Sequence, residues 1–311
     1  MSSVVPALCS LLGEKNTLDL IIPTASQGLL WSVLAIGVYL TFRVLDVADL
    51  TVEGSFPLGA ATAAALLTQG WSPLPSIFVA SFAGMLAGAA TGLLTTKLKI
   101  PALLSGILTM IALYSVNLRI MGRANLPLLR VDTLFNAFDG IFEDKQTAVF
   151  FVGLITVAIV CVFCYWFFGT EIGAAVRATG FNPNMIRANG VDTDVTIILG
   201  LLLSNGLVAV SGALVAQSNG FADVGMGVGT IVIGLASVII GEVIFGTPSF
   251  WRCLLSVVLG SITYRVVIAV VLQMGMPPND LKLFTAILVA IALSLPLIQS
   301  RIKEQRRKEA D

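Results

Sequence analysis

Long apolar segments, interrupted by short polar or charged connections, occupy almost the whole chain. A helix needs about 20 mainly apolar residues to cross the hydrocarbon core of a bilayer. By that measure the pattern predicts nine membrane spans, at residues 24–45, 50–69, 74–96, 101–121, 147–168, 193–216, 225–245, 252–273 and 281–299. We therefore expect an all-α, polytopic membrane protein in which residues 1–311 form a single transmembrane domain.

Two of these spans begin in an unusual way. The second starts with Asp49, Glu53 and Pro57, and the seventh opens with Asp223 and several glycines. Polar and glycine-rich backbone is tolerated at membrane depth only where it is buried in protein or lines an aqueous cavity. Broken helices at corresponding places in two halves of a transporter mark its binding site. The pattern thus predicts two broken or re-entrant segments and two related halves, joined around residues 120–146.

The composition agrees with a membrane location and disfavours several classes of activity. Hydrophobic residues make up 57% of the chain and charged residues 12%, whereas about a quarter of a soluble domain is charged. The net charge of zero gives no reason to expect a nucleic-acid partner. Histidine is absent, the four cysteines lie in apolar surroundings, and the sequence has neither a phosphate-binding loop nor a zinc motif. We expect no catalytic residue, metal or cofactor in this chain.

The distribution of basic residues predicts the orientation in the membrane. The tail at 300–311 is strongly basic, and cytoplasmic segments of membrane proteins carry the excess of Lys and Arg. Counting spans back from a cytoplasmic tail places the loop at 122–146 outside, the charged island at 170–192 in the cytoplasm and the N-terminus outside. The same count places these basic residues on the cytoplasmic side: Arg43, Lys97, Lys99, Arg177, Arg187 and Arg252.

Arg265 lies near the middle of the eighth span, with apolar residues on both sides. An ionisable group at this depth is costly and is a candidate for function. Two interpretations are open: a buried ion pair with Glu242, Asp223 or Asp49, or a place in the lining of a solute path. In the second case its guanidinium suits the carboxylate of an amino acid, which it can bind in a bidentate manner.

Other polar and aromatic residues near the two broken segments complete the candidate path. Asp49 and its neighbours form the densest polar cluster at a membrane entry, although a simple helix cap would also explain them. Phe56 and Phe221 stand beside the broken segments, where they would contact a ring or pack between helices. The candidate path residues are Asp49, Glu53, Ser55, Phe56, Asn117, Asn205, Phe221, Asp223 and Arg265.

The charged island at 170–192 predicts a helix–turn–helix knob. Glu171 suits the first turn of a short helix, and Gly180 is expected to stop it. Asn182 begins a second helix, Gly190 offers its end, and Asp192 can cap the next membrane span. In the third span, Gly84, Gly88 and Gly92 share one face, which allows close packing within the subunit or at a dimer seam.

Several spaced motifs together resemble one known family, the permease subunits of bacterial ABC importers of the branched-chain amino acid and ribose type. Within it, the chain is most similar to the sub-family tied to tryptophan and tyrosine uptake. The matching motifs are Gly173-x-x-x-Arg177-Ala178-x-Gly180 with Ala188-x-Gly190-Val191, Asp49-Leu-Thr-Val-Glu-Gly-Ser-Phe56, Gly220-Phe-Ala-Asp-Val-Gly-Met-Gly227, Leu103-Leu104-Ser105-Gly106-Ile107 and Pro277-Pro278-x-Asp280-Leu281-Lys282.

The resemblance implies a particular assembly in the bacterial cytoplasmic (inner) membrane. The island at 170–192 would be the coupling helix that docks into ATP-binding subunits, which carry the ATP and Mg²⁺. An extracytoplasmic binding protein would deliver the solute, and a second copy or a close relative would form the other half of the pore. The residues expected to meet the ATP-binding subunit are Glu171, Gly173, Ala174, Arg177, Gly180, Asn182 and Arg187.

A second class of function also fits broken helices with intramembrane charges, namely a secondary transporter that couples its solute to an ion. Such a transporter works alone and needs no cytoplasmic knob with a thin Gly/Ala face. The knob therefore favours an ATP-driven importer.

Overall fold

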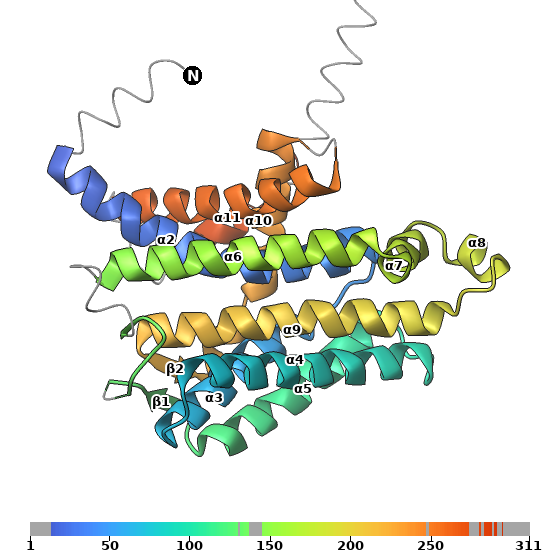
Figure 1. The fold of residues 1–311 in the computed structure, drawn as a ribbon, viewed down its shortest axis with the longest axis horizontal. Coiled ribbons are helices and arrows are strands. Elements are labelled where there is room, and N and C mark those ends of the chain that lie inside the picture. The colour runs from blue at the N-terminus through green and yellow to red at the C-terminus, as the bar shows by residue number, and fades with distance from the viewer. Residues whose placement is uncertain are drawn as a thin grey trace, which may run out of the picture.

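The computed structural model describes residues 14–129, 131–136, 145–246, 249–273, 280, 283–287, 289–290 and 294. Most of this chain is helical (Figure 1). The long elements are α2 (Glu14–Tyr39) with η1 (Leu40–Val44), α3 (Val52–Thr68), α4 (Pro73–Thr96), α5 (Ala102–Met121), α6 (Lys145–Gly169), α9 (Thr193–Asn219), α10 (Thr230–Phe245) and α11 (Phe250–Gln273). The short ones are β1 (Asn125–Pro127), α7 (Glu171–Phe181), α8 (Pro183–Ala188), β2 (Phe221–Asp223) and η3 (Val224–Gly227).

Within the described residues, seven helical stretches are long and apolar enough to cross a membrane. They correspond to seven of the nine predicted spans. The second predicted span, 50–69, is the 17-residue helix α3, which is shorter because its first residues are not helical. The ninth, 281–299, lies largely outside the described residues.

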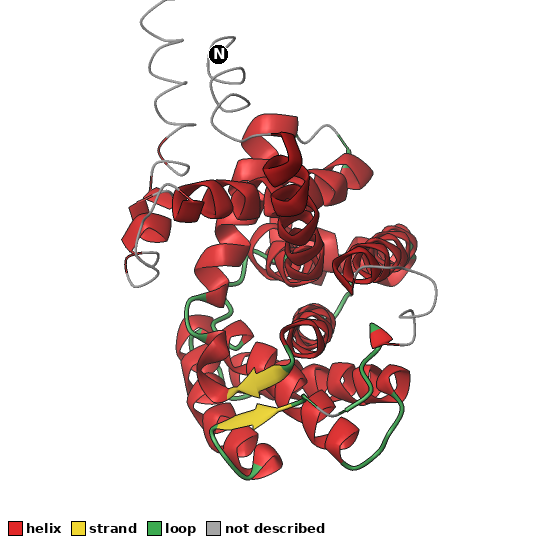
Figure 2. Ribbon diagram, turned by 90° about the vertical axis from the view of Figure 1, so that its left-hand side faces the viewer, coloured by secondary structure: helices red, strands yellow, loops and turns green. Residues whose placement is uncertain are grey.

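The long helices lie side by side and give the molecule two distinct ends. In Figure 1, α7 and α8 project at the right-hand end, and β1 and β2 lie at the left. The two strands pair antiparallel, with Leu126 opposite Ala222, and Figure 2 shows them side by side near the ends of the helices. We call these two ends the knob end and the strand end.

Helix α9 lies at the centre of the packing, against α2, α3 and α4. Glycines on α4 make the close approach possible: a side chain at Gly88 would collide with the backbone of Leu201, and one at Gly92 with Ile198. Gly84 meets Asn205 and Ala209 in the same way. The glycine face predicted on the third span therefore packs within the subunit, and its alternative use as a dimer seam is wrong.

Basic residues gather around one carboxylate at the knob end. The Asp194 carboxylate lies in the first turn of α9 and forms three ion pairs. Its partners are Lys97 Nζ at 3.1 Å, Lys99 Nζ at 3.7 Å and Arg187 Nη2 at 3.8 Å. Three segments of the chain, the α4–α5 connection, α8 and the start of α9, therefore meet around one carboxylate.

Candidate functional site

The two segments predicted to be broken meet inside the bundle. After η1 the chain runs from the knob end into the bundle without helical structure, and α3 begins at Val52. The Leu45 side chain, at the start of this segment, packs against Gly200. From the strand end, β2 and η3 lead to Gly229, where α10 begins. The Gly229 N–H donates to Glu53 Oε1 at 3.0 Å. The N-termini of α3 and α10, which carry partial positive charge, thus meet at the Glu53 carboxylate.

Three of the predicted path residues form one buried network beside this junction. Asp49 is fully buried, and its carboxylate accepts from Asn205 Nδ2 at 2.7 Å and from the Thr51 N–H at 2.9 Å. Ser55 donates to Asn205 Oδ1 at 2.7 Å. Asp49 therefore does more than cap a helix, because it ties the entry of α3 to the middle of α9.

A cavity of about 320 Å³ lies beside Glu53, between α3, α5 and η3. Asn117 is fully buried in its wall; its Nδ2 donates to Gly54 O at 3.3 Å, whereas its Oδ1 has no partner in the described structure. We call this space the carboxylate cavity. Its lining residues are Glu53, Gly54, Pro57, Met110, Ile111, Tyr114, Ser115, Asn117, Val224 and Val228.

A second cavity, also of about 320 Å³, contains Arg265 and is called the guanidinium cavity. The Arg265 guanidinium lies over the Trp31 ring, 4.1 Å from its centroid, and its buried Nε has no hydrogen-bond partner in the part of the chain described. The cavity is lined by Val228, Gly229, Val232, Ile233, Tyr264, Arg265, Ile268, Thr285 and Ala286.

The interpretation of Arg265 as a member of a buried ion pair is wrong for the three acidic partners considered. Glu242 pairs with Arg43 at 3.0 Å, Asp223 accepts from Asn125 Nδ2 at 3.2 Å, and Asp49 is held by Asn205. The face of an indole ring, which attracts cations, takes the place of a carboxylate. The partner of Arg265 is therefore an aromatic residue of α2, which the sequence pattern did not single out.

The remaining path candidates lie apart from the two cavities. Phe56 is fully buried and packs against Trp31, with ring centroids 5.0 Å apart. Phe221 is 41% exposed in β2, and Asp223 caps η3 by accepting from the Gly225 N–H at 2.7 Å. Contact of these residues with a solute stays a prediction, since they lie either in the core or at the strand end.

At the knob end, α7 and α8 form the predicted helix–turn–helix. Thr170 caps α7 by accepting from the Gly173 N–H at 3.3 Å, and Asn182 caps α8 by accepting from the Met185 N–H at 3.0 Å. Asp192 then caps α9, accepting from the Asp194 N–H at 2.8 Å.

The prediction that Gly180 stops α7 is wrong, because the helix continues to Phe181. Gly180 instead packs against the backbone of Val44 and Leu45, a contact that leaves no room for a side chain. Gly173 faces inward in the same way, against Phe167 and Phe168. Both glycines therefore join the knob to the membrane helices.

The outer surface of the knob combines charged and apolar side chains. Of the residues predicted for the partner interface, those exposed to solvent are Glu171, Ala174, Arg177, Asn182 and Arg187. Beside them lie apolar residues that were not predicted: Phe181 is 93% exposed, Ile172 56% and Met185 49%. The sequence could have predicted these contact residues, because large apolar residues are out of place in an island of polar and small residues.

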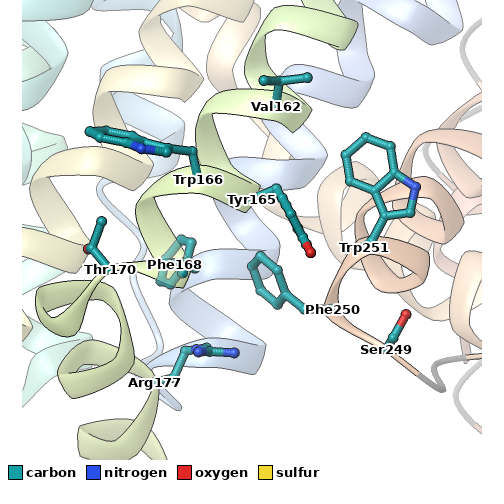
Figure 3. A pocket seen from close by; sticks show the side chains of 10 residues that line it. Val162, Tyr165, Trp166, Phe168, Thr170, Arg177, Ser249, Phe250 and Trp251 are labelled. Carbon is teal, nitrogen blue, oxygen red and sulfur yellow. The ribbon is translucent and has the colours of Figure 1, made fainter.

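Arg177 also faces an aromatic cavity of about 670 Å³ between α6, α7 and the start of α11. Its guanidinium carbon lies 5.6 Å from the centroid of Phe250 (Figure 3). Tyr165, Trp166 and Trp251 line the same space. Aromatic residues at this position suit the depth of lipid headgroups.

Comparisons with known proteins agree on a family. Residues 20–293 match the family described as "Branched-chain amino acid transport system / permease component". The chain is 39% identical over 288 residues to the "Tyrosine transport system permease protein" of Clostridioides difficile (strain R20291), covering 93% of this chain and 95% of that protein. It is 32% identical over 281 residues to an uncharacterized protein of Rickettsia prowazekii (strain Madrid E), covering 89% and 98%.

A more distant relative is the "Galactofuranose transporter permease protein YtfT" of Escherichia coli (strain K12), 26% identical over 188 residues, with 59% of this chain and 52% of that protein covered. The family match extends across the broken segments, both cavities and the knob. The chain therefore belongs to the family of permease components of branched-chain amino acid transport systems.

Proposed function

We propose that this chain forms half of the membrane pathway of an ATP-driven importer, located in the bacterial cytoplasmic membrane with its C-terminus in the cytoplasm. ATP is bound and hydrolysed by separate subunits, and an extracytoplasmic binding protein delivers the solute. The solute is an amino acid, and an aromatic one is supported by the relative that is named as a tyrosine permease.

The observation that carries this proposal is the apolar tip of the knob. Phe181 is 93% exposed at the end of the molecule that also gathers basic side chains. An exposed cluster of large apolar residues, surrounded by polar ones, marks a protein–protein interface. A transporter that works alone would have no use for such a surface, whereas a permease needs one to receive force from its ATP-binding partner.

A physical connection runs from this surface to the two cavities. Gly180 of α7 touches the backbone of Val44 and Leu45, which lead directly into the segment that holds Asp49. Asp49 and Asn205 anchor that segment beside the start of α3, where Glu53 meets α10. A partner with different affinity for two positions of the knob would thereby shift the population of two arrangements of the junction.

The complete membrane domain in this proposal has nine spans in two related halves. Two features support it: α3 and α10 each follow a non-helical segment, and their N-termini meet at Glu53. The chain reaches the start of α3 from the knob end and the start of α10 from the strand end. Two discontinuous helices whose N-termini meet inside the bundle are the arrangement that places a binding site near the middle of the membrane.

A second copy of the chain covers the face of α5 in this proposal. The carboxylate cavity is bounded by Ile111 and Tyr114, which are 60% and 55% exposed in the single chain. A carboxylate that opened toward lipid tails at this depth would be costly. A neighbouring subunit on α5 would instead enclose Glu53 in a polar path between the two copies.

The experiment that tests this function is co-purification with ATP-binding subunits from the native membrane, followed by ATPase assays in nanodiscs. Phe181→Glu places a charge in the apolar tip and should abolish co-purification and solute-stimulated ATPase activity. Leu129→Glu is the matched control for co-purification, because Leu129 is 88% exposed near the strand end; this variant should still co-purify with the ATP-binding subunits. Uptake driven by an ion gradient, with the purified chain alone, would overturn the proposal in favour of a secondary transporter.

A further inference from the structure

The polar atoms of the carboxylate cavity are suited to a ligand that donates hydrogen bonds. Glu53 contributes a carboxylate, and the fully buried Asn117 contributes an Oδ1 atom without a partner in the described structure. Tyr114 and Ser115 add hydroxyl groups, and no Lys or Arg lines the space. A buried acceptor without a donor is destabilising, so a ligand that supplies the donor is favoured. An ammonium group has both the charge and the donors.

The guanidinium cavity has the opposite character. Among the described residues, Arg265 is the only charged one that lines it, and its buried Nε lacks a partner there. Trp31 covers one face of the guanidinium and leaves its edge for hydrogen bonds. A carboxylate can accept two parallel hydrogen bonds from such an edge.

The two cavities adjoin each other at Val228 and Gly229. Val228 lines both, and Gly229 lines the guanidinium cavity while its N–H donates to Glu53 in the other. Gly229 has a φ of 85°, in the region that favours glycine, and it presents no side chain between the cavities. The hydrogen bond from Gly229 to Glu53 therefore joins the carboxylate of one cavity to the backbone that lines the other.

We propose that the two cavities are the halves of one site for a zwitterionic amino acid. The ammonium group binds Glu53 and Asn117 Oδ1, and the carboxylate binds Arg265. Binding replaces the Gly229 N–H with the ammonium as the donor to Glu53. The released N–H, at the N-terminus of the 16-residue helix α10, then donates to the solute carboxylate. This inference rests on the proposed function, because it assumes that the solute is an amino acid.

Binding to the full-length chain in lipid nanodiscs tests the proposal with three probes of one shape. L-tyrosine carries both charges, tyramine only the ammonium, and 3-(4-hydroxyphenyl)propanoate only the carboxylate. The wild type should bind L-tyrosine about tenfold or more tighter than either of the others, as expected when a second charged hydrogen-bonding partner is added. A second set of probes tests the case in which the solute is aliphatic: L-leucine carries both charges, isoamylamine only the ammonium, and 4-methylpentanoate only the carboxylate.

Variants should separate the two ends of the ligand. Glu53→Gln should weaken the binding of the zwitterion and of the amine by about tenfold or more, and should leave the affinity for the acid unchanged. Arg265→Gln should weaken the binding of the zwitterion and of the acid, and should leave the affinity for the amine unchanged. Asn117→Asp adds a second carboxylate and should tighten amine binding, a gain that a purely structural role would not produce. Asp132→Asn is the control, since it removes a negative charge from the loop near the strand end.

Equal effects of Glu53→Gln and Arg265→Gln on all three probes, or no binding of either zwitterion to the wild type, would overturn the zwitterion site. ATP-dependent uptake in proteoliposomes separates this failure from a failure of the proposed function. Uptake that persists in the Glu53→Gln and Arg265→Gln variants, with unchanged affinity, contradicts the site alone. The expected binding pattern, together with uptake by the purified chain that needs no ATP-binding partner, supports the site and contradicts the ATP-driven function.

Discussion

At the scale of single residues, glycines determine how closely the central helices approach each other. A side chain at Gly59 of α3 would overlap the backbone of Ala209, and one at Gly212 of α9 would overlap the backbone of Phe56. Small residues at such positions let two helix backbones come into direct contact within a membrane, where packing rather than the hydrophobic effect holds helices together.

Gly59→Val should therefore destabilise the protein by about 2 kcal/mol, the typical cost of overfilling a packed core. Backbone atoms form the opposing surface, so the contact cannot be relieved by rotation of a side chain. The thermal unfolding midpoint in detergent would fall. Gly169→Val is the control, because no atom lies within 4 Å of the position that a Cβ would take there. Equal shifts for both variants would contradict the packing argument.

Sequence patterns identified some of these residues and missed others for a definite reason. The regular spacing of Gly84, Gly88 and Gly92 on one helix predicted a close contact, and the structure shows it with α9. Trp31 gave no such signal, because its contact with Arg265 joins residues far apart in the chain. Spacing within an element is visible in one sequence, whereas a pair brought together by the fold is not.

At the scale of elements, α7 is a short helix that depends on its first turn. The Thr170 hydroxyl accepts from the Gly173 N–H and donates to Phe167 O at 2.6 Å, so it links the end of α6 to the start of α7. A helix of 11 residues has little stability of its own. Its caps and its contact with Val44 hold it in place.

Thr170→Ala should destabilise α7 by about 1 kcal/mol, the typical cost of losing an N-cap. Hydrogen exchange at the first amides of α7 should become about fivefold faster, the factor that corresponds to this free energy. Thr263→Ala is the matched control, because the Thr263 hydroxyl only donates to Leu259 O within α11. Unchanged exchange in α7 would show that the cap is not what holds it.

The positions of the helices were more predictable than the conformations between them. Apolar length alone located seven spans, and the polar residues Asp49 and Asp223 lie just before the starts of α3 and η3. The end of α7 was missed because Gly180 was interpreted by its local preference, whereas its contact with Val44 decides its role. The caps at Asn182 and Asp192 were predictable, since capping depends only on nearby residues.

At the scale of the whole molecule, the outer face of α5 has no neighbour among the described residues. Helix α5 exposes a row of large apolar residues, and the carboxylate cavity lies beside that row. Lipid suits apolar side chains but not the Glu53 carboxylate. A second copy on α5 would meet both requirements, which a single chain in lipid does not.

A cysteine introduced at Ile111 should therefore cross-link two copies in native membranes when a flexible bismaleimide is added. Ile159→Cys on α6 is the control, because Ile159 has a similar exposure, 64% against 60% for Ile111, on a different face. The parent chain measures the background from its own thiols, of which Cys161 and Cys164 are buried. Dimers from Ile159→Cys without dimers from Ile111→Cys would move the seam to α6.

The cluster around Asp194 has a consequence for how a partner reaches the knob. Three cationic side chains share one carboxylate there, so the surface beside the apolar tip carries a surplus of positive charge. Such a field accelerates diffusional encounter with an acidic surface and weakens within about 8 Å at physiological ionic strength. In the proposed complex, Phe181 would act only on contact, where it would slow dissociation. Electrostatic steering would then set the association rate, and the apolar tip would set the lifetime of the complex.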